Sequence, residues 1–160
     1  PLVRTLRMQL NETVSFWVRH GWEVEPISTE SSAQALRYAV DTGTRLPMHA
    51  LASGKALLAA MPPEELDRYF AETKFERFTP STVGNEAKLR KELEEVRKTG
   101  FAYTDEEYSL GIKGIGRVVK MGGEIAGALS VATPKVRLTE ALEQRTRDLL
   151  QRTAGLLEES

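Results

Sequence analysis

Two runs of β-branched and aromatic residues near the start of the chain predict a pair of strands. Residues 13–19 (TVSFWVR) form the first run and residues 22–28 the second. His20 and Gly21 leave room only for a short turn between them, so the runs predict an antiparallel hairpin. Residues 2–10, rich in leucine, are typical of the end of a helix.

A third strand is expected over residues 36–40, where apolar and small or basic residues alternate. Leu36, Tyr38 and Val40 share one side of an extended chain, although a short helix is also compatible with this stretch. Farther on, residues 101–104, 115–121 and 124–133 have the composition of strands. Gly122 and Gly123 between the last two runs favour a tight hairpin turn.

The helical signals lie in the middle of the chain and at its end. Ser53 is an expected N-cap for a helix of strong helix formers up to residue 60. Prolines followed by acids at 62–65 predict a second helix start, and Asn85 caps a third that Gly100 ends. A last amphipathic helix is expected from residue 138 to the C-terminus.

These elements predict an α+β fold: an antiparallel sheet of about six strands, flanked by helices that are inserted between the third and fourth strands. No repeat, low-complexity segment or linker divides the sequence, so residues 1–160 are expected to form a single domain. The chain begins without methionine, and we expect it to be part of a longer protein.

Composition narrows the classes of function. The 160 residues carry a net charge of −1 and no cysteine, which excludes disulfides, thiol nucleophiles and thiolate metal sites. Lys and Arg do not cluster as they do in nucleic-acid-binding domains. No apolar run is long enough to span a membrane and no signal peptide opens the chain, so we expect a cytoplasmic protein without membrane contact.

Residues 45–60 (RLPMHALASGKALLAA) are the strongest candidate for a binding site. Pro47 favours an extended entry, and small residues at 50 and 52–54 permit close approach to a helix start whose free N–H groups favour an anion. A phosphate loop is excluded, because His49 stands where glycine is needed and Ala56 where Ser or Thr is needed. A helix start packed tightly on a sheet remains the alternative interpretation.

The sequence contains no recognisable catalytic motif. His20 lies in a predicted turn, and neither it nor His49 has the histidine partner of a metal-binding helix, so we expect no metal and no cofactor. Ser53 lacks an identifiable Asp–His pair, and we expect no enzyme.

An acidic segment, residues 105–107, and one serine are further candidates for contact with a ligand. In a continuing strand, Asp105 and Glu107 would point to one side and Glu106 to the other. Ser130 lies in an otherwise apolar strand and is either a satisfied core hydroxyl or a pocket group.

The sequence resembles the effector-binding domain of IclR-type bacterial transcriptional regulators, and the matching segments follow one another in the same order. The resemblance covers nearly the whole chain. It rests on Leu36-Arg37, Gly43, Leu46 to Ala50, Ser53 to Ala59, Thr79-Pro80 with Thr82, Leu89, Leu93, Val96-Arg97, Gly100 to Ala102, Asp105 to Glu107, Gly111-Ile112, Ala128 to Val131, Pro134 and Arg137.

The resemblance implies a GAF-like domain that binds a small organic acid and takes part in a dimer or a dimer of dimers. DNA would be bound only through an N-terminal winged helix-turn-helix, which this chain lacks and which would precede Pro1. A structural oligomerisation module with a filled interior is the alternative. An enzyme is disfavoured because the redox members of GAF-like folds depend on cysteines.

The resemblance also implies the residues of the effector site. Ala52 and Ser53 would offer backbone N–H groups to a carboxylate, Leu46 would be an apolar wall, and Thr104 or Asp105 together with Ser130 would supply polar contacts. Gly114 and Ala132 stand where some relatives carry larger or polar side chains. Lost polar partners and gained volume would favour a bulkier or less polar effector, such as an aromatic acid. Lys55 would either help to hold the acid or face water.

Overall fold

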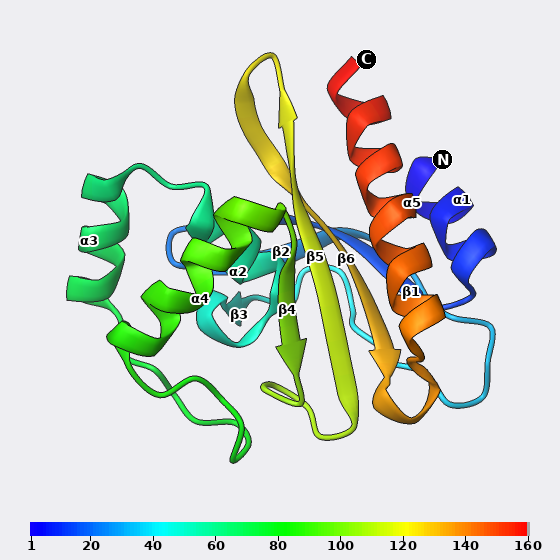
Figure 1. Ribbon diagram of the computed structural model, residues 1–160, viewed down its shortest axis with the longest axis horizontal. Coiled ribbons are helices and arrows are strands. Elements are labelled where there is room, and N and C mark those ends of the chain that lie inside the picture. The colour runs from blue at the N-terminus through cyan, green and yellow to red at the C-terminus, as the bar shows by residue number, and fades with distance from the viewer. Residues whose placement is uncertain (160) are drawn as a thin grey trace.

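The computed structural model, which describes residues 1–159, has one six-stranded antiparallel sheet in the order β3-β2-β1-β6-β5-β4 (Figure 1). The strands are β1 (Thr13–His20), β2 (Glu23–Glu30), β3 (Leu46–Pro47), β4 (Ala102–Asp105), β5 (Ile112–Met121) and β6 (Glu124–Pro134). The helices are α1 (Leu2–Leu10), α2 (Ala52–Ala59), α3 (Pro63–Glu72), α4 (Glu86–Thr99) and α5 (Glu140–Glu159), with 3-10 turns η1 (Met48–Ala50) and η2 (Lys135–Arg137). The α+β prediction and the insertion of helices between the third and fourth strands are confirmed.

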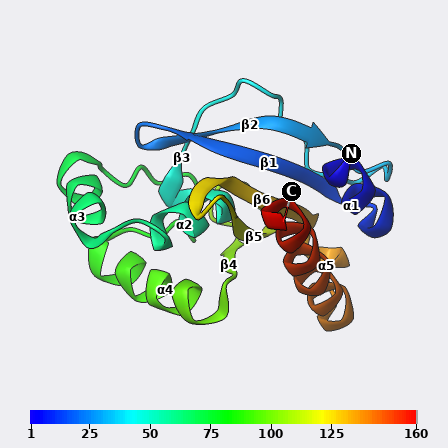
Figure 2. The same ribbon diagram turned by 90° about the horizontal axis from the view of Figure 1, so that it is seen from above.

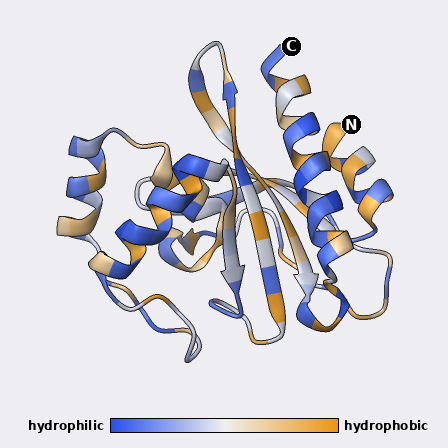
Figure 3. Ribbon diagram, in the orientation of Figure 1, coloured by the Kyte–Doolittle hydropathy of each residue, from blue (hydrophilic) through white to orange (hydrophobic). Residues whose placement is uncertain are grey.

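One apolar core lies on each side of the sheet. One joins α2, α3 and α4 to β1 and β2, around Leu58, Leu89 and Leu93. The other joins α1 and α5 to β5 and β6, around Leu129 and Leu150. Figure 2 shows these two groups of helices on opposite sides of the curved sheet. Figure 3 shows hydrophilic residues along the sides of α4 and α5 that face the viewer, as expected for amphipathic helices.

Several helix ends follow the local sequence. The side chain of Asn85 accepts a hydrogen bond from the Lys88 N–H, and Gly100 ends α4 with φ 84°, as predicted. The N-cap of α2 is Leu51, so the prediction that Ser53 caps this helix is wrong.

Within residues 1–159, no helix combines the length and the apolar character needed to cross a membrane.

The third strand is not where the alternating pattern predicted it. Residues 31–45 form no helix or strand, and β3 consists only of Leu46–Pro47. The Leu36 side chain is exposed, so the alternation at 36–40 does not mark a buried sheet face. Asn11 at the end of α1, Thr13 of β1 and Arg137 of η2 hold this segment instead, as described below.

Candidate functional site

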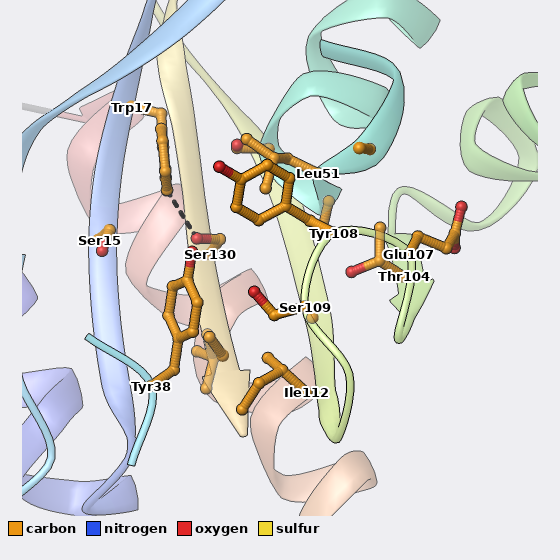
Figure 4. Close-up of a pocket in the computed structure, with 16 residues that line it drawn as sticks. Ser15, Trp17, Tyr38, Leu51, Thr104, Glu107, Tyr108, Ser109, Ile112 and Ser130 are labelled. Carbon is orange, nitrogen blue, oxygen red and sulfur yellow. Dashed lines mark hydrogen bonds between the residues drawn. The ribbon is translucent and has the colours of Figure 1, made fainter. Parts of the chain in front are cut away.

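A cavity lies between the centre of the sheet and the start of α2, with about 490 Å³ of empty space, the part open to solvent included. Segments that are far apart in sequence form its walls (Figure 4). The lining residues are Ser15, Trp17, Tyr38, Ala50, Leu51, Ala52, Ser53, Thr104, Glu107, Tyr108, Ser109, Ile112, Gly114, Ser130, Val131 and Ala132.

The first turn of α2 forms one wall. Its first intrahelical hydrogen bond runs from the Lys55 N–H to the Leu51 carbonyl, 2.9 Å, which leaves the N–H groups of Ala52 and Ser53 ahead of the hydrogen-bond ladder. Gly116 of β5 allows this close approach, because an added Cβ would lie 2.9 Å from the Ala52 carbonyl. The turn therefore presents backbone donors directly beside the sheet.

Ser53 adds an unsatisfied side-chain hydroxyl to this wall. The residue is 1% exposed, and its Oγ has no hydrogen-bond partner within residues 1–159. A buried hydroxyl without a partner costs free energy, on the order of 1–3 kcal/mol. Among the described residues, the start of α2 thus has a side-chain hydroxyl and backbone N–H groups without hydrogen-bond partners, next to an open cavity.

The opposite wall carries hydroxyl groups from β4, from the loop after β4 and from β6. The Oγ of Ser130 accepts a hydrogen bond from Trp17 Nε1, 2.8 Å, so this serine is both satisfied and part of the cavity. Figure 4 shows the hydroxyls of Thr104 and Ser109 directed toward the cavity. Neither hydroxyl is hydrogen-bonded within the part of the chain that the structure describes.

Aromatic rings close the remaining sides. Trp17 comes from β1, Tyr38 from the irregular segment 31–45, and Tyr108 from the loop after β4 (Figure 4). Burial, with a smaller contribution from Tyr108, raises the pKa of Tyr38 to about 12. The phenol of Tyr38, like an ordinary tyrosine, is neutral at physiological pH, and burial extends its range as a hydrogen-bond donor to more alkaline pH.

Lys55 neither lines the cavity nor faces water. Its side chain is fully buried, and its Nζ lies 2.6 Å from a carboxylate oxygen of Glu92 and 2.6 Å from one of Glu107. Burial raises the pKa of Glu107 and outweighs the opposite effect of Lys55. Two carboxylates thus share one cation, which ties the first turn of α2 to α4 and to the loop after β4.

The expected common side for Asp105 and Glu107 is wrong. Glu106 has a left-handed backbone, φ 57°, which ends the alternation of a strand. The half-exposed Asp105 side chain pairs with Lys135, at 3.1 Å, and does not line the cavity. Glu107 turns inward to Lys55 instead.

Among the predicted effector-site residues, the structure brings Ala52, Ser53, Thr104, Gly114, Ser130 and Ala132 together around the cavity. It leaves two outside: Asp105, and Leu46, which is buried in the core beneath α2. Gly114 does not enlarge the cavity as expected. An added Cβ there would lie 2.7 Å from Thr104 Oγ1 and 3.3 Å from Ala52 Cβ, so neighbouring atoms already fill the space.

The polar and aromatic lining residues that sequence reasoning missed are Ser15, Trp17, Tyr38, Tyr108 and Ser109, and the apolar ones include Leu51, Ile112 and Val131. No local motif marks them, because they converge only after β1, the segment 31–45 and the loop after β4 meet. His49, in contrast, lies away from the lining. It is buried, its Nε2 lies 2.9 Å from the Glu76 carbonyl oxygen, and burial lowers its pKa.

The fold is an α+β domain with an internal cavity beside the N-terminus of α2. Residues 1–158 match the sequence model of the family described as bacterial transcriptional regulator IclR C-terminal. The chain belongs to this family.

Relatives and solved structures agree with this assignment. The chain is 34% identical over 155 residues to the HTH-type transcriptional repressor AllR of Klebsiella pneumoniae. The alignment covers 96% of this chain and 57% of AllR. The chain therefore spans just over half the length of this relative. The Thermotoga maritima IclR crystal structure matches with a TM-score of 0.93 and 26% identity, covering 99% of this chain and 64% of that one.

A second solved structure is a complex. The inducer-binding domain of the PobR transcription factor from Acinetobacter, a double mutant bound to 3-hydroxybenzoic acid, matches with a TM-score of 0.89 and 27% identity. The match covers 98% of this chain and 93% of that domain.

Proposed function

We propose that this chain is the effector-sensing domain of an IclR-type transcriptional regulator and that its cavity binds a small organic acid. The whole protein would bind DNA through a domain outside this chain, as a dimer or tetramer. A ligand that binds one arrangement of the oligomer more tightly shifts its population and so changes DNA affinity. Residues 1–160 act as one domain in this proposal.

The observation that carries the proposal is the pairing of a buried, unpartnered Ser53 hydroxyl with free backbone donors at the start of α2. Helix N-termini favour anions because their N–H groups lack intrahelical acceptors and the helix dipole is positive there. A ligand carboxylate beside Ala52 and Ser53 would satisfy both. No Lys or Arg side chain among residues 1–159 lines the cavity, so these neutral donors would supply most of the recognition.

The rest of the ligand meets aromatic rings and hydroxyls. Trp17, Tyr38 and Tyr108 suit a flat apolar body, and Thr104, Ser109 and Ser130 suit polar substituents on it. The complex of the PobR domain with 3-hydroxybenzoic acid supports an aromatic acid as the first ligand to test. The aromatic walls of the cavity also support an aromatic acid. Gly114 gives no such support, because Thr104 and Ala52 fill the space beside it.

The alternative function, an oligomerisation module with a filled interior, is disfavoured by the open, hydroxyl-lined cavity. An enzyme is disfavoured by relatives that are named as transcriptional repressors. The oligomerisation module predicts no specific uptake of carboxylates, and an enzyme predicts turnover of a bound ligand.

Isothermal titration calorimetry with 3-hydroxybenzoate and with its uncharged analogue 3-hydroxybenzamide tests the proposal. We expect the acid to bind at least about tenfold more tightly, a difference of ~1.4 kcal/mol. A parallel thermal-shift screen of acetate, succinate and benzoate tests the ligand class. Stabilisation by small polar acids alone would disprove the aromatic class, and the absence of binding by every carboxylate would disprove the proposal itself.

A further inference from the structure

Three consecutive residues at the end of α1 hold the segment that carries Tyr38 to the cavity. Asn11 is the C-cap of α1, with a left-handed backbone of φ 52°, and its N–H donates to the Arg7 carbonyl, 2.6 Å. Glu12 and Thr13 follow directly and lead into β1. We call residues 32–38 the strap, because this irregular segment runs from these three residues to the cavity wall.

Asn11 and Thr13 bind the strap through its backbone and its polar side chains. The Asn11 carbonyl accepts hydrogen bonds from Ser32 Oγ, 2.8 Å, and from Gln34 Nε2, 2.6 Å. The Asn11 side chain accepts one from the Ala33 N–H, 3.1 Å. The Thr13 hydroxyl donates to the Tyr38 carbonyl, 2.6 Å, and accepts from the Ser32 N–H, 3.1 Å.

Glu12 secures the same junction from the side of the sheet. It is 1% exposed, and both of its oxygens accept hydrogen bonds from Arg137 of η2, from Nε and Nη2 at 2.7 Å each. The same Nη2 also donates to the Leu36 carbonyl, 2.7 Å. Since a buried carboxylate is stable only when paired, Arg137 fixes the α1 end and the strap in one arrangement.

The two tyrosines of the cavity are held in different ways. Tyr38 stands at the end of the strap, whereas Tyr108 stands on the loop after β4, which the hydroxyl of Thr82 and Lys55 fix through Glu107. Of these two tyrosines, only Tyr38 is hydrogen-bonded, within residues 1–159, to the residues that follow α1, while Ser15 and Trp17 of the cavity continue from the same residues along β1. The strap therefore adds a hydrogen-bonded route from the cavity to the end of α1, beside the covalent route along β1.

We propose that the strap transmits the state of the cavity to α1: a change at Tyr38 alters the stability of the last turn of α1 through Asn11, Glu12 and Thr13. This inference rests on the proposed function, since the ligand is what changes the environment of Tyr38 in the regulator. In physical terms, the two ends of the strap share one set of contacts, so ordering at one end shifts the population at the other.

Hydrogen exchange of the ligand-free chain tests the route, with Tyr38→Ala compared with Tyr108→Ala. Both substitutions remove an aromatic wall of one cavity, but only Tyr38 is joined to α1. We expect Tyr38→Ala to speed exchange of the amides of residues 8–13 and 32–38 by about tenfold, with β5 and β6 unchanged. Tyr108→Ala should speed exchange only around residues 105–111.

Equal effects of the two variants on α1, or no effect of Tyr38→Ala there, would overturn the inference. If Tyr38→Ala speeds exchange throughout the sheet, Tyr38→Leu keeps apolar bulk at the wall and decides by the same criterion. The result does not depend on a ligand, so failure of the route is distinguishable from failure of carboxylate binding. With 3-hydroxybenzoate added, protection of residues 8–13 should rise in the native chain and not in Arg137→Lys, which loses the guanidinium fork.

Discussion

The buried ammonium of Lys55 lies 2.6 Å from Glu107 and joins the first turn of α2 to the loop that carries Tyr108 over the cavity. Glu92 lies at the same distance on the other side. The lysine of the Ser-Gly-Lys sequence is therefore structural, and its positive charge is used within the protein instead of being offered to a ligand.

Removing this cation should be costly. Lys55→Met leaves two neighbouring carboxylates without their shared partner, and we expect a loss of ~3–5 kcal/mol in unfolding free energy, measured by urea denaturation. Lys98→Met removes an exposed lysine paired with Glu95 and should cost less than about 1 kcal/mol. Similar losses in the two variants would contradict the assigned role of Lys55.

The raised pKa of Glu107 predicts a signed effect of pH on stability. Its folded-state pKa exceeds the ordinary value of 4.5, so the folded chain holds this proton more tightly than the unfolded chain. The contribution of Glu107 to stability is therefore fully present below pH 4.5 and declines as pH rises through the folded pKa. Urea unfolding of the native chain and Glu107→Gln across this range measures it. The native chain should lose stability relative to the variant as pH rises, and a gain would contradict the burial argument.

The hydrogen bond between Trp17 and Ser130 should also be measurable. Ser130→Ala leaves the indole N–H beside the cavity without its acceptor, with an expected loss of ~1–3 kcal/mol in unfolding free energy. Ser109→Ala removes a hydroxyl of the same cavity that bonds to nothing within residues 1–159, and should change stability by less than about 0.5 kcal/mol. Equal losses would mean that the Trp17 bond contributes nothing.

Two helical glycines should respond in opposite directions to alanine. An added Cβ at Gly54 would collide with the carbonyl of Met48, so Gly54→Ala should destabilise the protein although alanine is the better helix former. Gly155 of α5 has open space around it, and Gly155→Ala should stabilise the protein by ~0.5–1 kcal/mol. Thermal unfolding of the two variants gives the signs directly, and stabilisation by Gly54→Ala would disprove the close packing of η1 on α2.

The elements that the sequence predicts well are those with local causes. The hairpins around Gly21 and Gly122, the Asn85 cap and the Gly100 stop depend on residues within a few positions. The failed strand at 36–40 has a non-local cause, because Arg137 and Thr13 bind the backbone there. Asp105 fails for a different reason, since one left-handed residue, Glu106, redirects the loop.

The site was predictable only in part for the same reason. Ala52, Ser53 and Ser130 carry recognisable signals, namely a small-residue helix start and a serine in an apolar strand. Tyr38 and Tyr108 carry none, because a cavity wall depends on which distant segments meet. The burial and pairing of Lys55 likewise depend on Glu92, which lies among other charged residues on α4. The sequence does not distinguish Glu92 from them.

An NMR titration of the isotopically labelled chain with 3-hydroxybenzoate, following the backbone amides, tests most directly whether a carboxylate binds at the start of α2. We expect the amides of Ala52 and Ser53 to shift most, with smaller shifts at Thr104 and Ser130 and none along the outer side of α4. Saturating shifts that are largest elsewhere, or no shifts at Ala52 and Ser53 with any carboxylate that binds, would contradict a carboxylate site at the start of α2.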